Sequence, residues 1–295
     1  MKSDALLIPA LRAGRVARVS DSLTHTLLKP PHALVFDSGV GGLSVLREIA
    51  AAQPHVRLSY AADNAAFPYG LKTESELVRR VSSVIRQLVE RTEPDIVVIA
   101  CNTASTTALD AVRGFLKIPV IGVVPAIKPA AASSQTRVIG LLGTNATVAS
   151  SYTSTLVAQF AAGCAVLTCG APELVEAAER KIQGLPVDMD MIRKVLRRLF
   201  DQPGGGRLDT VVLGCTHFPL LGRELAVAAP HPVTWLDSGA AIARRVATLL
   251  QGHPIPPDAP PLVHRALFTA ESDAVERMRP GLERFGLSEV DFLPG

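Results

Sequence analysis

The sequence predicts an α/β fold built from two similar halves, each with a mostly parallel sheet. Short β-branched runs alternate with segments of helical periodicity along the whole chain. The apolar runs lack the polar–apolar alternation of a half-exposed strand, which indicates strands covered by helices on both faces. One strand-and-loop pattern also occurs twice. The repeat predicts two halves with the same topology.

The predicted strands are taken in chain order from these apolar runs. They lie at residues 33–36, 58–61, 96–100, 120–124, 138–142, 165–168, 211–214 and 233–236. Thr73 and Glu76 have the spacing of a capping box and predict a helix that runs to about Arg91. The stretch 202–206 is expected to be a surface turn, and the proline-rich stretch 252–261 a linker too short to tether a third domain.

The repeat aligns residues 95–103 with residues 209–217, each an acid, a buried strand, a small residue and a cysteine. The following strand recurs as 119–122 and 232–235, and a weaker match joins 34–39 to 139–144. We therefore expect a first α/β domain of residues 31–128 plus 238–295 and a second of residues 129–237. An active site in the cleft between the two pseudo-symmetric domains follows from this arrangement.

Composition excludes several classes of protein. Hydrophobic residues make up 48% of the chain and charged residues 19%, which argues against disorder. The net charge of +3 is carried by residues 1–30, so the body offers no basic surplus for nucleic acid, and 4% aromatic residues offer few stacking platforms. No apolar run is long enough to span a membrane, and four cysteines do not suggest a disulfide framework. We expect a cytoplasmic protein.

Residues 1–30 are predicted to form an N-terminal extension. The apolar run 6–8 is too short for a signal peptide, and Asp4 and Asp21 interrupt the basic residues of the stretch. A targeting segment is the less favoured interpretation. A ragged extension or a regulatory arm is the favoured one.

Cys101 and Cys215 follow matching strands of the repeat, where loops of open α/β sheets bind ligands. Each precedes a predicted helix start, and His217 lies two residues after Cys215. A helix N-terminus or a protonated histidine lowers the pKa of a thiol. The alternative is that each cysteine is a small buried apolar side chain. Two thiols on opposite sides of one ligand could remove a proton from one face of a carbon and add one to the other.

The glycine-rich turn at 37–42 follows the first strand and reads Asp-Ser-Gly-Val-Gly-Gly. Such a turn lets backbone N–H groups approach a carboxylate or a phosphate at a helix N-terminus. It matches neither the dinucleotide fingerprint nor a P-loop. Asp37 would act as an acid–base partner or orient an ammonium group, and the alternative is a plain helix N-cap.

Metal and pyridoxal phosphate chemistry are both disfavoured. The Cys-x-His spacing of Cys215 and His217 is not a usual zinc pattern, so no metal is expected. A pyridoxal phosphate enzyme needs a Schiff-base lysine. Lys128 is the one lysine beside a sheet-edge loop, and prolines at 125 and 129 bracket it, which indicates a surface residue at a helix start. No cofactor is expected.

With these residues identified, the chain resembles the glutamate racemases of the aspartate/glutamate racemase superfamily. The matching segments run in family order from about residue 33 to the end of the chain. They are residues 37–42, 60–70, 100–105, 122–125, 214–221 and 237–239.

The resemblance implies interconversion of L- and D-glutamate without a cofactor, with Cys101 and Cys215 as acid–base residues toward the D and L enantiomers respectively. It implies that Asp37 and His217 assist the thiols. It also implies a set of residues that hold the substrate's ammonium and carboxylates, namely Ser38, Tyr69, Gly70, Asn102, Thr103 and Thr216 beside Asp37 and His217.

An assisting glutamate is expected in the stretch 169–176 or just after it. The match is loose there, so Glu176 is the first choice while Glu173 and Glu179 stay open. The resemblance further implies supply of D-glutamate for peptidoglycan. It leaves open whether the chain forms a homodimer and whether the N-terminal extension binds a cell-wall precursor as an activator.

Two other functions stay open. An aspartate or hydantoin racemase of the same superfamily would use the same chemistry with a different pocket shape. A non-catalytic protein that binds a small acid would use the same loops without proton transfer.

Overall fold

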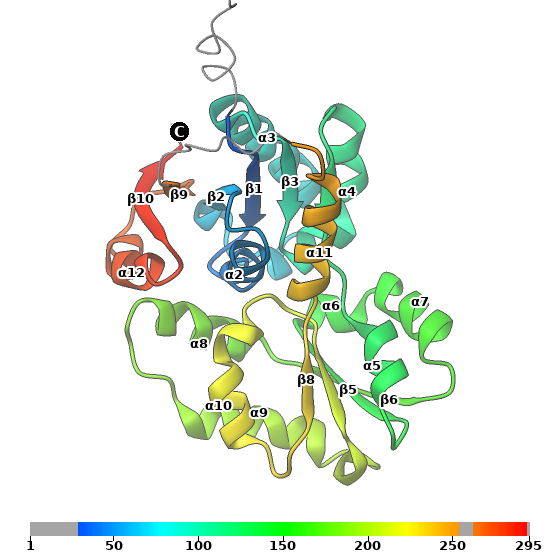
Figure 1. The fold of residues 1–295 in the computed structure, drawn as a ribbon. Coiled ribbons are helices and arrows are strands. Elements are labelled where there is room, and N and C mark those ends of the chain that lie inside the picture. The colour runs from blue at the N-terminus through cyan, green and yellow to red at the C-terminus, as the bar shows by residue number, and fades with distance from the viewer. Residues whose placement is uncertain (1–28, 254–261, 294–295) are drawn as a thin grey trace, which may run out of the picture.

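The computed structural model describes residues 29–253 and 262–293, and these form two α/β bodies stacked one on the other (Figure 1). Nearly all of the expected N-terminal extension lies outside the described residues. Within the described ranges, no helix is both long and apolar enough to cross a membrane.

The first body is built around a six-stranded sheet in which every pair of neighbouring strands is parallel. The strand order is β10-β9-β2-β1-β3-β4. The strands are β1 (His32–Asp37), β2 (Arg57–Ala62), β3 (Ile96–Ile99), β4 (Val120–Gly122), β9 (His264–Phe268) and β10 (Leu287–Phe292).

Helices cover both faces of this sheet, as its unbroken apolar strands require. One face packs on α2 (Leu43–Ala52), α11 (Gly239–Leu249) and α12 (Asp273–Glu283). The other packs on α3 (Glu74–Thr92) and α4 (Asn102–Phe115). The capping box predicted at Thr73 is confirmed, because its hydroxyl accepts from Glu76 N and the Glu76 carboxylate accepts from Thr73 N.

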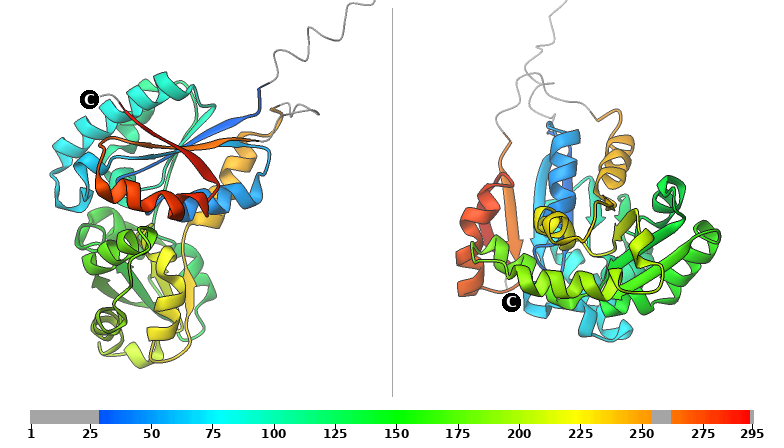
Figure 2. Two further views of the ribbon diagram at one scale, coloured as in Figure 1. Left: turned by 90° about the vertical axis from the view of Figure 1, so that its left-hand side faces the viewer. Right: turned by 90° about the horizontal axis from the view of Figure 1, so that it is seen from below.

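The second body has a four-stranded parallel sheet of order β6-β5-β7-β8. Its strands are β5 (Val138–Gly143), β6 (Ala165–Gly170), β7 (Thr210–Leu213) and β8 (Thr234–Leu236). The helices of this body are α5 (Ile127–Ser133), α6 (Asn145–Ala149), α7 (Ser151–Phe160), α8 (Pro172–Ile182), α9 (Met189–Phe200) and α10 (Gly222–Ala228). The two views of Figure 2 show helices on both sides of each sheet.

The internal repeat predicted from the sequence is visible in the topology. In each sheet the first of four consecutive strands lies between the second and the third, and the fourth lies beside the third. The orders are β2-β1-β3-β4 in the first sheet and β6-β5-β7-β8 in the second. All eight predicted strands are present, within two residues of their expected limits. The predicted fold class, two α/β halves with parallel sheets, is confirmed. The exact domain limits stay a prediction.

Strands β9 and β10 were not predicted. Their sequences are His-Arg-Ala-Leu-Phe and Leu-Ser-Glu-Val-Asp-Phe, in which polar residues interrupt the apolar ones. They extend one edge of the first sheet, and β10 is only partly covered. A search for unbroken apolar runs misses such an edge strand because one of its faces meets solvent.

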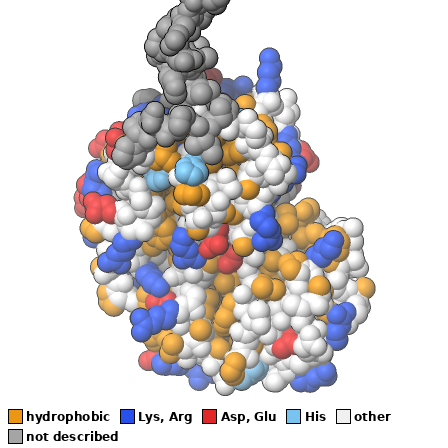
Figure 3. Space-filling model, in the orientation of Figure 1, with side chains coloured by type: hydrophobic (Ala, Val, Ile, Leu, Met, Phe, Trp, Pro, Cys, Tyr) orange, Lys and Arg blue, Asp and Glu red, His pale blue; other side chains and the backbone are white. Residues whose placement is uncertain are grey.

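One hydrophobic core joins the two bodies. It contains Val35 and Leu46 of the first body together with Leu174 and Val211 of the second. On the face shown in Figure 3, basic and acidic side chains are interspersed over the surface of both bodies.

Candidate active site

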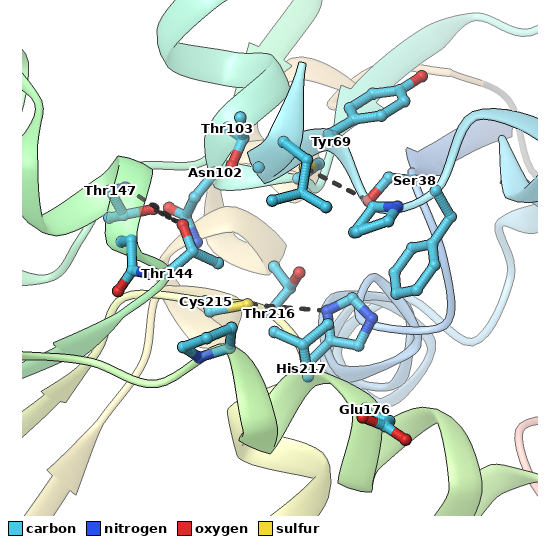
Figure 4. A pocket seen from close by; sticks show the side chains of 18 residues that line it. Ser38, Tyr69, Asn102, Thr103, Thr144, Thr147, Glu176, Cys215, Thr216 and His217 are labelled. Atoms are coloured by element: carbon cyan, nitrogen blue, oxygen red, sulfur yellow. Dashed lines mark hydrogen bonds between the residues drawn. The ribbon is translucent and has the colours of Figure 1, made fainter.

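A cavity of about 380 Å³ lies between the two bodies, at the carboxyl ends of β1, β3, β5 and β7 (Figure 4). This volume lies within the range of small-molecule sites. Both bodies contribute to its lining. The lining residues are Ser38, Phe67, Pro68, Tyr69, Gly70, Leu71, Cys101, Asn102, Thr103, Thr144, Asn145, Thr147, Pro172, Val175, Glu176, Cys215, Thr216 and His217.

Cys101 reaches the cavity from the first body. It follows β3 and is the N-cap residue of α4, as predicted. Its Sγ lies 3.8 Å from Oγ of Ser38. Burial, and then the nearby negative charge of Asp37, raise the pKa of the Cys101 thiol well above its usual range. The thiol is therefore held in its protonated form.

Cys215 reaches the same cavity from the second body. It follows β7, but a 3-10 turn (Phe218–Leu221) comes next, so it does not sit directly at an α-helix start as the sequence suggested. Its Sγ lies 3.7 Å from Nδ1 of His217, and Nε2 of His217 lies 2.8 Å from Oε1 of Glu179. The imidazole bridges a thiol and a carboxylate.

His217 is held in a protonated form by these neighbours. Burial alone would lower the pKa of this histidine. The hydrogen bonds to Cys215 and Glu179 outweigh burial and raise the pKa well above its ordinary value.

Asp37 is fully buried and contacts a residue near each thiol, Ser38 beside Cys101 and Thr216 next to Cys215. Its Oδ1 accepts from Ser38 N at 2.5 Å and from Ser38 Oγ at 3.2 Å, and its Oδ2 accepts from Thr216 Oγ1 at 2.8 Å. Burial raises its pKa, although these hydrogen bonds and His217 act in the opposite direction. The alternative role as N-cap of the next helix does not hold, because that position belongs to Gly42.

The glycine turn after β1 brings the two bodies into close contact. A Cβ on Gly39 would lie 2.2 Å from Oε1 of Glu179, and one on Gly41 would lie 2.4 Å from Nδ1 of His217. Val40 N donates to Oε1 of Glu179 at 2.8 Å. The backbone of this turn therefore binds a carboxylate of the chain itself, whereas the sequence led us to expect a ligand's carboxylate.

Of the residues expected to hold substrate, all except the fully buried Asp37 line the cavity. Four of them line it as expected, namely Ser38, Gly70, Thr103 and Thr216. Asn102 also lines it, and its Oδ1 is buried without a hydrogen-bond partner in the part of the chain that the structure describes. Burying an acceptor without a hydrogen bond costs free energy, and a donor group of a bound ligand would remove that cost.

Tyr69 is also among the residues expected to hold the substrate. The ring lines the cavity, but the hydroxyl donates to Oδ2 of Asp63 at 2.6 Å. The phenol is therefore engaged within the protein. Its ring and the backbone of Gly70 are what the cavity presents.

Sequence analysis missed the contribution of the second body's first loop. Thr144 is the N-cap residue of α6, and its Oγ1 lies 3.0 Å from Oγ1 of Thr147. Both hydroxyls line the cavity beside Asn145. The weak repeat match between 34–39 and 139–144 was the signal, because it places Thr144 where Gly39 stands in the first body.

The three candidate glutamates occupy different places. Glu179 is mostly buried and touches both His217 and the Val40 amide. Glu176 is exposed at the edge of the cavity, apart from the other labelled side chains in Figure 4. Glu173 pairs with Arg198 at 2.9 Å. The geometry favours Glu179 over the first choice made from the sequence, because α8 turns Glu179 and not Glu176 toward His217.

Lys128 lies outside the cavity. It is exposed near the start of α5, with its Nζ 5.3 Å from the centre of the Phe160 ring. Within residues 29–253 and 262–293, no group of three or more histidine, cysteine, aspartate or glutamate side chains could hold a metal ion.

Comparison with known proteins agrees with this geometry. Residues 38–246 match the family model of Asp/Glu/Hydantoin racemases. The chain is 44% identical over 289 residues to the glutamate racemase of Pectobacterium carotovorum, covering 96% of this chain and 98% of the relative. It is 46% identical over 266 residues to that of Escherichia coli, covering 89% of this chain and 91% of the relative.

Solved structures show the same similarity. The crystal structure of Escherichia coli glutamate racemase in complex with L-glutamate and the activator UDP-MurNAc-Ala superposes with a TM-score of 0.84 at 45% identity, covering 90% of this chain and 98% of that chain. Glutamate racemase isoform RacE1 of Bacillus anthracis gives a TM-score of 0.76 at 28% identity over 90% and 97%. The chain belongs to the Asp/Glu/Hydantoin racemase family and, within it, to the glutamate racemases.

Proposed function

We propose that the chain interconverts L- and D-glutamate by two-base proton transfer between Cys101 and Cys215, without a cofactor. The observation that carries the proposal is one cavity reached by two thiols, each from the same strand position of its own body. Inversion of a stereocentre through a planar carbanion needs an acid and a base on opposite faces of one carbon.

The two thiols have different partners, which suits this chemistry. The raised pKa of Cys101 keeps that thiol protonated as the acid. Nδ1 of His217 lies 3.7 Å from Sγ of Cys215, where the imidazole can exchange a proton with Cys215 as the base. In this state Cys215 takes the α-proton from L-glutamate while Cys101 delivers a proton to the opposite face. The reverse pair of states acts on D-glutamate.

Protons can return through the groups beside each thiol. Ser38 Oγ lies within 3.8 Å of Cys101 Sγ and 3.2 Å of Asp37 Oδ1, so it can relay a proton from Asp37 to Cys101. The raised pKa of Asp37 makes its carboxyl a suitable source. On the other side His217 exchanges a proton with Cys215, and Glu179 orients the imidazole. We propose Glu179, not Glu176 or Glu173, as the assisting glutamate.

Polar groups around the cavity fit an acidic amino acid. The buried oxygen of Asn102 can accept from an ammonium, and Thr103 offers a hydroxyl to a carboxylate. Ser38 and Thr216 also line the cavity, with their hydroxyls donated to Asp37. Thr144 and Thr147 of the second body offer two more hydroxyls, which we assign to the second carboxylate of glutamate.

We further propose that the chain acts in the cytoplasm and supplies D-glutamate for peptidoglycan. The Escherichia coli relative was crystallised with the activator UDP-MurNAc-Ala, which motivates the same class of activator here. Participation of residues 1–30 in that response, association as a homodimer, and the domain limits 31–128 plus 238–295 and 129–237 are parts of this proposal. Comparing activation of the full chain with that of a variant lacking residues 1–28 tests the first of these.

The direct experiment follows the circular dichroism of L-glutamate against time with the purified chain as the sole addition. The signal should decay to zero, and D-glutamate should give the mirror-image curve. Aspartate and hydantoins serve as parallel substrates. A faster reaction with either would replace glutamate as the substrate, and thermal stabilisation by glutamate without any decay would indicate a non-catalytic binder.

A further inference from the structure

Asp63 is a fully buried carboxylate outside the catalytic set. It follows β2, and its exposed fraction is 0%. Four hydrogen bonds saturate its two oxygens. Oδ1 accepts from Arg80 Nη2 at 2.6 Å and Thr269 Oγ1 at 2.7 Å, and Oδ2 accepts from Arg80 Nε at 2.9 Å and Tyr69 Oη at 2.6 Å.

The charge on Asp63 is maintained by these donors. Burial alone would raise its pKa, but the hydrogen bonds from Arg80, Tyr69 and Thr269 outweigh burial and lower it. The Arg80 contact is bidentate, which fixes direction as well as distance. The cluster ties together three parts of the first body, namely the segment after β2, helix α3 and the end of β9.

The segment that Asp63 anchors is one wall of the cavity. Residues 67–71 all line the cavity, and the Phe67 ring lies 6.0 Å from the ring of His217. The same Phe67 ring would lie 3.0 Å from a Cβ on Gly39. The wall therefore touches the surroundings of both catalytic thiols.

Few other bonds hold this wall in place. Its own backbone donors make only local bonds, from Phe67 N to Asn64 O and from Leu71 N to Pro68 O, and Lys72 N donates to Tyr69 O around the 3-10 turn Tyr69–Leu71. Leu71 is 85% exposed. Asn64 bonds both backbone groups of Ala270, but it precedes the wall. The phenol of Tyr69 is the contact that fixes the wall from within.

The same contact determines what Tyr69 offers to a ligand. Burial and the negative charge of Asp63 raise the pKa of the phenol, so it stays protonated and donates to Asp63. The hydroxyl is thereby kept away from the cavity. Tyr69 thus belongs with Phe67, Leu71 and Val175 to the apolar part of the cavity lining.

We propose that Asp63, braced by Arg80, is a positioning residue for the racemisation: through Tyr69 it fixes the wall 67–71 against which the substrate is held. The inference rests on the proposed function for its substrate. The wall contacts the substrate equally in the L-to-D and the D-to-L reactions. It therefore stabilises the bound substrate and the transition state to the same extent, and its loss changes KM more than kcat.

The test compares Asp63→Asn, Tyr69→Phe and the double variant. We expect Asp63→Asn to raise KM for both enantiomers about tenfold with kcat within about twofold, as loosened substrate positioning predicts. Tyr69→Phe should raise KM about threefold and add nothing in the Asp63→Asn background, because both remove the same tether. Arg80→Lys keeps the positive charge but loses the two-point contact of the guanidinium with Asp63. The KM of this variant should therefore lie between those of the wild type and of Asp63→Asn.

Arg279→Gln is the matched control, because Arg279 forms a similar two-point contact with Glu276 on the exposed face of α12. It should leave KM unchanged. A merely structural role for Asp63 would lower Tm and leave KM at its wild-type value in the folded protein. That result, or additive effects of the two substitutions, would overturn the proposal.

A second readout does not depend on glutamate. Cys101 is 7% exposed beside this wall, so its alkylation by iodoacetamide, followed by peptide mass spectrometry, reports whether the wall has opened. Asp63→Asn should alkylate Cys101 faster than the wild type. Equal rates of Cys101 alkylation in the variant and the wild type would overturn the positioning role, even if another compound proved to be the substrate. Failure of the wild type to racemise glutamate would instead refute the proposed function alone.

Discussion

The two bodies place the same residue type at the same strand end and then surround it differently. Cys101 has a hydroxyl and a carboxyl beside it, Ser38 and Asp37, both from its own body. Cys215 has an imidazole backed by a carboxylate, His217 and Glu179. Duplicated topology supplies two thiols on one cavity, and unequal neighbours give each thiol its own group for proton exchange.

The largest expected effect comes from removing either thiol. Cys101→Ser and Cys215→Ser should each lower kcat/KM by about three orders of magnitude or more, since neither acid–base step can be replaced from the other side. Polarimetry of L- and D-glutamate checks this. If one variant kept its full rate, the paired-thiol comparison would fail.

The second effect separates the candidate glutamates. Glu179→Gln should lower kcat about a hundredfold, because the imidazolium loses its counter-charge. Its pH profile should also change. The hydrogen bonds with Cys215 and then Glu179 raise the pKa of His217, so removing the Glu179 carboxylate should move the alkaline limb to lower pH.

Glu176→Gln is the comparison variant for this prediction. It should cost less than about threefold in kcat, because the exposed carboxylate does not touch His217. A larger loss in Glu176→Gln than in Glu179→Gln would reverse the assignment of the assisting residue.

The third effect tests the contact of the glycine turn with the second body. Gly41→Ala would put a Cβ 2.4 Å from Nδ1 of His217, so His217 must shift, and kcat/KM should fall roughly tenfold. Gly114→Ala is the matched control. Gly114 lies in α4 with no heavy atom within 4 Å of the added Cβ, so activity should not change and stability should rise by about 0.5–1 kcal/mol. Steady-state kinetics and urea unfolding measure both.

The smallest effect on activity comes from His32, at the amino end of β1 in the first body. Burial, and then the charge of Arg57, lower its pKa to about 4 from 6.5. The folded state keeps the imidazole neutral while the unfolded state protonates below 6.5. Stability should therefore fall as pH drops from about 6.5 to about 4, by about 3 kcal/mol in total.

Urea unfolding at pH 7.5 and pH 4.5 measures this dependence. His32→Gln should remove that part of the loss, whereas His55→Gln, at an exposed position, should keep the wild-type dependence. An unchanged slope in His32→Gln would show that other groups cause it.

The sequence predicted those parts of the fold that depend on buried strands. Apolar runs and the duplicated acid–strand–cysteine pattern located eight strands and both thiols. Strand β9 escaped because its buried apolar run, residues 266–268, is only three residues long, and the edge strand β10 escaped because polar residues interrupt its apolar ones.

Side-chain directions were the least predictable part of the site. Tyr69 was expected among the residues that hold the substrate, but its hydroxyl donates to Asp63, which no local pattern links to it. Glu176 and Glu179 differ by three residues on one helix, so both lie near one face. Only packing against the glycine turn decides that Glu179 meets His217.

The central claim is tested most directly by racemising L-glutamate in D₂O and analysing both enantiomers at early times. Two thiols on opposite faces predict that the D-glutamate formed carries deuterium at Cα while the remaining L-glutamate keeps its protium. A single base that works on both faces would instead wash deuterium into the remaining L-glutamate as fast as D-glutamate appears, and that result would contradict the account.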